Sequence, residues 1–95
     1  MKLAIAKRRS KRLAAGTLSF ADAIGVWYLM LYGVTNGIVH PFGASPFDSD
    51  HAALQEGNDV LKVSDTDWIE LPESEVDGYI LANTRNSWNP KTGLD

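Results

Sequence analysis

Apolar side chains dominate one long stretch of the chain, residues 23–39, in which no side chain carries a formal charge. Its most hydrophobic positions are separated by alternating spacings of four and three residues, which is typical of a helix packing lengthwise against another helix. This apolar stripe comprises Phe20, Ile24, Trp27, Leu31, Val34 and Ile38. The pattern predicts one apolar helix over about residues 20–39.

Capping and stop signals in the sequence indicate where this predicted helix begins and ends. Ser19 followed by Asp22 fits an N-cap with an early acid, and both favour a helix that begins near Phe20. Pro41 disfavours helical geometry at the residue before it. We therefore expect the helix to end at about Val39.

The surroundings of this helix are ambiguous, because its other faces are apolar too and such a helix is enclosed either by protein or by lipid. Twenty residues at 1.5 Å each span roughly 30 Å, the thickness of a hydrocarbon core. Cations before the segment and acids after it follow the positive-inside pattern for a cytoplasmic N-terminus. Aromatic residues in mid-helix (Trp27, Tyr28 and Tyr32) favour protein neighbours instead. A single membrane span and a helix buried in protein both stay open.

Shorter elements are expected on either side. Residues 2–15 contain good helix formers and predict a short helix ending at Gly16. Ser49 or Asp50 is a suitable N-cap for another short helix, ending at Gly57. Three apolar runs then predict short strands: residues 59–63, 67–71 and 76–82. The C-terminal tail is polar, and we expect it to be ordered by docking of Trp88.

These elements predict a mainly α protein with a small β portion. The segments are a basic N-terminal arm (1–18), the apolar helix (19–40) and an acidic docking segment (41–95). One chain of 95 residues has little else with which to cover a long apolar helix, so we expect partner chains to cover it.

Charge is distributed unevenly along the chain. Six of the nine lysines and arginines lie in the first twelve residues, and all twelve acids follow them, so the net charge of −3 divides into +6 and −9. Such asymmetry is typical of contact with nucleic acid or a membrane surface. The candidate residues for contact with a partner or with phosphates of lipid or nucleic acid are Lys7, Arg8, Arg9, Lys11 and Arg12.

No pattern of catalytic residues emerges. The chain has no cysteine, which excludes disulfides, thiolate chemistry and cysteine zinc sites. His40 and His51, with nearby Asp48 and Asp50, match no known spacing of metal ligands, although in a membrane His40 remains open as a pigment or haem ligand. The acids between Asp65 and Asp77 favour a negatively charged docking face over a catalytic pair. We expect no enzymatic activity, no cofactor, no metal and no small-molecule substrate.

The sequence thus predicts a small non-enzymatic structural or accessory subunit of a larger multi-chain assembly. The favoured form is a single-pass membrane subunit with its N-terminus in the cytoplasm, bound to protein subunits and anionic lipid headgroups. The alternative is a soluble virion structural protein of a phage or virus, whose basic arm contacts nucleic acid. A third hypothesis is a small soluble inhibitor that mimics nucleic acid with its acidic face.

Overall fold

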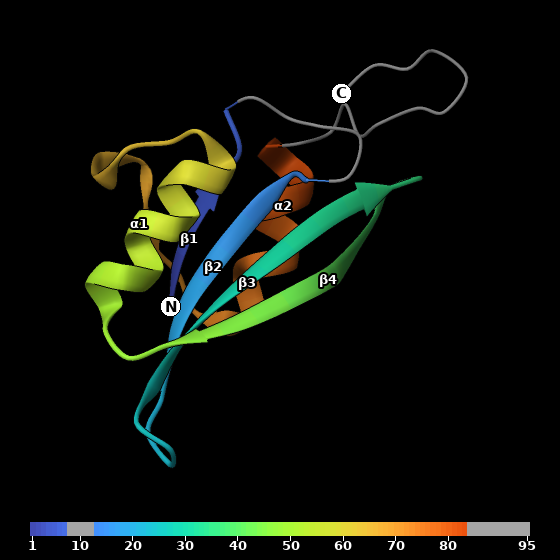
Figure 1. Ribbon diagram of the computed structural model, residues 1–95. Coiled ribbons are helices and arrows are strands. Elements are labelled where there is room, and N and C mark those ends of the chain that lie inside the picture. The colour runs from blue at the N-terminus through green and yellow to red at the C-terminus, as the bar shows by residue number, and fades with distance from the viewer. Residues whose placement is uncertain (8–12, 84–95) are drawn as a thin grey trace.

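One antiparallel sheet organises the protein, as a computed structural model describing residues 1–7 and 13–83 shows (Figure 1). Its five strands lie in the order β4-β3-β2-β1-β5. The strands are β1 (Lys2–Ile5), β2 (Ala15–Ala21), β3 (Val26–Thr35), β4 (Ile38–Phe47) and β5 (Ile69–Glu70). The helices are α1 (Asp50–Leu61) and α2 (Val76–Asn83), with two single 3₁₀ turns, η1 (Asp65–Asp67) and η2 (Glu73–Glu75).

The two helices cover opposite faces of the sheet, with α1 in front and α2 behind in Figure 1. Successive side chains of a strand point to opposite faces, and β1 shows the consequence. Leu3 packs in a cluster with Val76 and Ile80 of α2. Its neighbour Ala4 packs with Leu61 of α1. The core therefore consists of two apolar layers separated by the sheet.

The apolar helix predicted over residues 20–39 is wrong, because this segment forms the end of β2, all of β3 and the start of β4. Since both faces of β3 are covered, apolar side chains occur at both odd and even positions of the strand. Leu29 packs on the α1 side, whereas Val34 belongs to the cluster of α2. A strand buried on both faces has the same continuous apolar run as a buried helix. The protein is α/β, not mainly α.

The membrane span predicted for the same residues is wrong as well. Within the described part of the chain, no helix is long and apolar enough to cross a membrane. Strands from residues 1–18, 19–40 and 41–95 lie side by side in one sheet.

Two turns replace the continuous helix. Asn36 and Gly37 both have positive φ, +53° and +76°, which is the backbone of the two-residue type I′ turn that joins β3 to β4. A longer turn joins β2 to β3, where the carbonyl of Ala21 accepts hydrogen bonds from the N–H groups of Ile24 (3.2 Å) and Gly25 (2.8 Å). The type I′ turn matches the right-handed twist of the strands that it connects.

The remaining predictions had mixed outcomes. The helix expected to begin at Ser49 or Asp50 is confirmed at its start, with Ser49 as the N-cap, because Ser49 Oγ accepts a hydrogen bond of 3.1 Å from the N–H of Ala52. It does not end at Gly57 but continues to Leu61. Its C-cap is Lys62, in the left-handed conformation.

Three other predictions are wrong. In the described part of residues 2–15, β1 and the start of β2 take the place of the expected helix, and the strands expected at 59–63 and 76–82 are helical in large part. Of the strand expected at 67–71, only Ile69–Glu70 pairs, with β1. Burial of apolar side chains against the sheet decided these outcomes over local propensity.

Strand β4 forms one edge of the sheet, and its prolines lie where they face away from β3. The two-residue turn makes Thr35 and Ile38 a hydrogen-bonded pair, so Val39 and Pro41 direct their backbone groups outward. The register shifts by one residue after Pro41, and Pro46 faces outward again. Proline has no N–H group, so the edge lacks donors at these positions.

We expect Pro41→Thr/Pro46→Thr to increase self-association, because the double substitution restores two outward N–H donors on an edge of ten residues. Sedimentation velocity at matched concentrations measures this. The exposed Pro72, which lies outside the sheet, supplies the control Pro72→Thr. An unchanged sedimentation coefficient in the double variant would contradict the idea that the two prolines protect the edge of β4 from self-association.

Candidate protein-binding surface

The hairpin of β2 and β3 extends past both helices (Figure 1), and the sequence places apolar residues at its end. Phe20 and Trp27 are directly opposite in the register, and their rings pack with centroids 5.1 Å apart at an interplanar angle of 46°. Phe20 is 48% exposed and Ile24, in the turn, is 63% exposed. We call Phe20, Ile24 and Trp27 the hairpin patch.

Two adjoining hollows lie at the base of the hairpin patch and share Lys2, Leu18 and Trp27 as lining residues. The larger has a volume of about 320 Å³ and is also lined by Phe20 and Glu70. The smaller, about 120 Å³, is bounded by the first residues of α1. We call the two hollows together the groove. Ligand pockets for small molecules span roughly 300–1,000 Å³, so the larger hollow lies at the lower end of that range and the smaller one below it.

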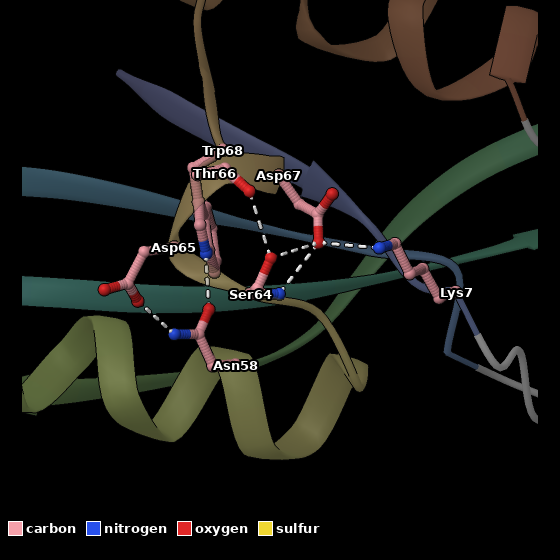
Figure 2. Close-up of polar contacts among 7 residues, drawn as sticks. All are labelled: Lys7, Asn58, Ser64, Asp65, Thr66, Asp67 and Trp68. Atoms are coloured by element: carbon pink, nitrogen blue, oxygen red, sulfur yellow. Dashed lines mark hydrogen bonds and ion pairs between the residues drawn. The ribbon is translucent and has the colours of Figure 1, made fainter.

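A separate polar cluster lies at the other end of β1, where Figure 2 shows Lys7 pointing toward Asp67. Lys7 Nζ is 3.0 Å from Asp67 Oδ2. The same carboxylate oxygen accepts hydrogen bonds from the backbone N–H of Ser64 (2.8 Å) and from its hydroxyl (3.0 Å). The N–H of Ser64, and after it the hydrogen bond from Lys7, hold the pKa of Asp67 below its ordinary value of 3.8.

Hydrogen bonds join this cluster to α1 (Figure 2). The indole N–H of Trp68 donates to Asn58 Oδ1 at 2.7 Å, and Asn58 Nδ2 donates to Asp65 Oδ1 at 2.6 Å. Trp68 also packs beside Leu61 in the core. These contacts fix the loop after α1, so the cluster is best explained as structural.

The pKa of Asp67 leads to a pH-dependent prediction. Because the pKa is lowered in the folded state, the contribution of this carboxylate to stability is present above the unfolded-state pKa and is lost as the pH falls through the folded value. We expect the carboxyl carbon of Asp67 to titrate below pH 3.8 in NMR spectra, and Lys7→Gln to raise its midpoint. Lys62→Gln, at an exposed cation elsewhere, is the control. Equal midpoints in the natural chain and Lys7→Gln would exclude the ion pair as a cause.

The apolar stripe predicted from sequence is dispersed by the fold. Phe20 and Trp27 come together, but through strand pairing and not through a helix. Leu31 lies on the α1 side, Val34 on the α2 side, and Ile38, 65% exposed, follows the turn between β3 and β4. The contribution of Lys2 and Leu18 to the groove was missed, because nothing in the sequence shows that β1 pairs with β2.

The other candidate residues have separate outcomes. Of the cations proposed to contact phosphate, Lys7 is described, whereas Arg8, Arg9, Lys11 and Arg12 lie outside the described residues, as does Trp88. His40 Nε2 is 3.1 Å from Thr35 Oγ1, and His51 lines the smaller hollow. Among the residues that the structure describes, no three or more His, Asp or Glu side chains are grouped so that they could hold a metal ion.

The predicted acidic face is partly occupied by contacts within the chain. Asp65 accepts from Asn58, Asp67 pairs with Lys7, and Glu70 Oε2 lies 2.7 Å from the amino group of Met1. Comparisons with protein-family models, curated proteins and solved structures found no match. The functional argument therefore depends on the surface itself.

Proposed function

We propose that the protein is a small non-enzymatic accessory subunit that binds a partner protein through the hairpin patch and the groove beside it. The observation that carries this proposal is the pair Phe20 and Trp27, whose rings pack at a tilt of 46° at the projecting end of a hairpin and border a hollow of about 320 Å³. Aromatic side chains in or beside pockets commonly contribute a large share of the binding free energy of protein interfaces.

The exposure of these side chains has a physical cost that a partner would remove. Burial of apolar surface contributes about 25 cal/mol per Å². Elsewhere in the sheet, large apolar residues such as Leu29 and Leu3 are buried beneath α1 and α2. On the hairpin no helix of the described chain covers Phe20 or Ile24. A contiguous exposed apolar patch with a polar border is typical of an interaction site.

Site-specific crosslinking tests the proposal. A photoreactive amino acid at Ile24, introduced in the cells from which the gene comes, is expected to give a discrete adduct with one partner. The same group at the exposed Gln55 of α1 should not give that adduct. Identical adducts at both positions, or none at Ile24, would contradict a specific interface at the hairpin.

Substitution of the aromatic pair supplies a quantitative prediction. We expect Phe20→Ser and Trp27→Ser each to weaken partner binding at least about 30-fold, because a central interface residue contributes about 2 kcal/mol or more. Calorimetry with the crosslinked partner measures the affinity. Circular dichroism confirms that each variant is folded, and Ile38→Ser, at an apolar residue that is 65% exposed on the other hairpin, is the control. Equal losses at Ile38 would show that the effect is not specific.

Phosphate contact by the basic segment stays a separate prediction. In the sequence this segment lies between β1 and β2, whereas the hairpin patch follows from the end of β2. Exchange of Arg8, Arg9, Lys11 and Arg12 for glutamine should abolish salt-dependent binding to DNA or RNA. Lys7 is left unchanged because it pairs with Asp67. If the natural chain shows no such binding, the prediction is wrong.

A further inference from the structure

Part of the sheet on the side of α2 lies outside the apolar core. Val34 packs in the cluster of α2. Alternate residues of a strand point to the same face, so Met30 and Tyr28 also lie on the side of α2. Both side chains are half-buried, and neither belongs to the three apolar clusters of the described residues.

This region extends over three neighbouring strands, because residues paired across strands share a face. Ser19 and Pro46 are both paired with Tyr28, and Ala44 is paired with Met30. We call Ser19, Tyr28, Met30, Ala44 and Pro46 the open face. None of the five carries a formal charge, and Ala44 and Pro46 are exposed. An apolar sheet face is normally buried against a second layer of structure, so we expect the open face to have an occupant.

The last described element, α2, lies on the same side of the sheet as the open face, and residues 84–95 follow it in the sequence. Trp88 is the largest apolar side chain of this segment, and residues 86–90 carry no formal charge. Five extended residues, the separation of Trp88 from Asn83, span up to about 17 Å. Tyr32 packs against the cluster of α2, and Met30 is about 7 Å farther along β3. The segment is therefore long enough for Trp88 to reach the open face.

We infer that the C-terminal segment of this chain, residues 84–95, docks on the open face with Trp88 against Met30 and Tyr28. A tryptophan side chain buries about 150–250 Å² when it packs, and an indole ring makes favourable contacts with a methionine sulfur. Attachment to α2 gives the segment an effective concentration in the millimolar range, which favours it over a second copy or another protein. The groove lies on the side of α1, so this inference is independent of the proposed function.

An engineered disulfide tests the inference, because the chain has no cysteine of its own. Ser87→Cys/Ala44→Cys places one thiol next to Trp88 and the other on the open face. The control, Ser87→Cys/Gln55→Cys, places the second thiol on the exposed surface of α1, across the sheet. With oxidised glutathione as the oxidant, the first pair should form a disulfide within the chain. Its effective concentration should be at least about 10-fold above that of the control pair.

Two results of this experiment would overturn the inference. Equal effective concentrations for the two pairs would mean that the segment has no preference for the open face. A disulfide between two chains, in place of one within a chain, would make a second copy the occupant. Either result would leave the proposed function standing, because the hairpin patch takes no part in the experiment.

Methionine methyl groups supply a second measurement that needs no engineered cysteine. The chain has two methionines, Met1 and Met30, and Met1 packs against the cluster of α2. Trp88→Leu should shift the methyl NMR signal of Met30, because the ring current of an indole acts on nuclei beside it, and should move that of Met1 less. A Met30 signal that Trp88→Leu leaves in place would overturn the inference. So would a Met30 signal that moves with protein concentration instead, which would indicate a second copy.

Discussion

Gly57→Ala is expected to destabilise the protein by about 2 kcal/mol, although alanine is the better helix former. A Cβ atom at Gly57 would lie 2.7 and 2.8 Å from two ring carbons of Trp68 and 3.2 Å from Leu29 Cδ1. The Trp68 ring cannot retreat freely, because its N–H is bonded to Asn58. Overpacking of this kind costs about 1–3 kcal/mol or more, which outweighs the gain of about 1 kcal/mol in helix propensity.

Gly78→Ala in α2 is the matched control. A Cβ atom at this position has no neighbour within 4 Å, so only the propensity gain of about 0.5–1 kcal/mol should remain. Thermal unfolding should show the two substitutions moving Tm in opposite directions, with Gly57→Ala lowering it by about 10 °C. A rise in Tm for Gly57→Ala would mean that α1 does not pack closely on Trp68.

Gly57 also shows where sequence analysis of α1 succeeded and where it failed. Ser49 correctly marked the start of the helix, because an N-cap is a local feature of four or five residues. Gly57 was taken as the end because glycine commonly follows helices. Its actual role, permitting close approach of the Trp68 ring, depends on a residue eleven positions later. The real C-cap is a lysine, which is uncommon in the left-handed conformation.

The sheet was missed for a different reason. Apolar residues occupy both odd and even positions of β3. The alternation of apolar and polar residues that would distinguish a strand from a helix is therefore absent from this segment. Asn36 and Gly37 were the contrary signal, since Asn-Gly between apolar runs strongly indicates a hairpin. The helix prediction relied on the stripe at spacings of three and four and did not use the Asn-Gly signal. Positive φ at both turn residues shows that the hairpin signal was the better guide.

The candidate surface was only partly predictable. Sequence analysis identified Phe20 and Trp27 as packing residues, and they do contact each other. It placed them one above the other along a helix, facing a neighbouring helix. The hairpin instead places them side by side at an exposed end of the sheet, next to Lys2 from β1. That proximity results from strand pairing across the sheet, which no local pattern encodes.

A comparison of Leu3→Ala with Ile38→Ala should distinguish the two folds. In the helical interpretation, Ile38 belongs to the packed stripe and Leu3 to an arm that needs a partner. In the structure Leu3 is 0% exposed against α2, whereas Ile38 is 65% exposed. Replacing a buried leucine with alanine costs about 2–5 kcal/mol, because apolar contacts are lost and a cavity remains. An exposed isoleucine should change stability by about 0.5 kcal/mol or less.

Denaturant unfolding of the isolated chain measures both variants. The free energy of unfolding of a small domain is only about 5–15 kcal/mol. Leu3→Ala should therefore remove a large part of this free energy and lower the denaturant midpoint strongly. The midpoint of Ile38→Ala should stay close to that of the natural chain. A larger loss of stability for Ile38→Ala than for Leu3→Ala would contradict the sheet and support the predicted apolar helix. The central position of β1 between β2 and β5, with a helix on each face, makes Leu3 the more costly of the two to lose.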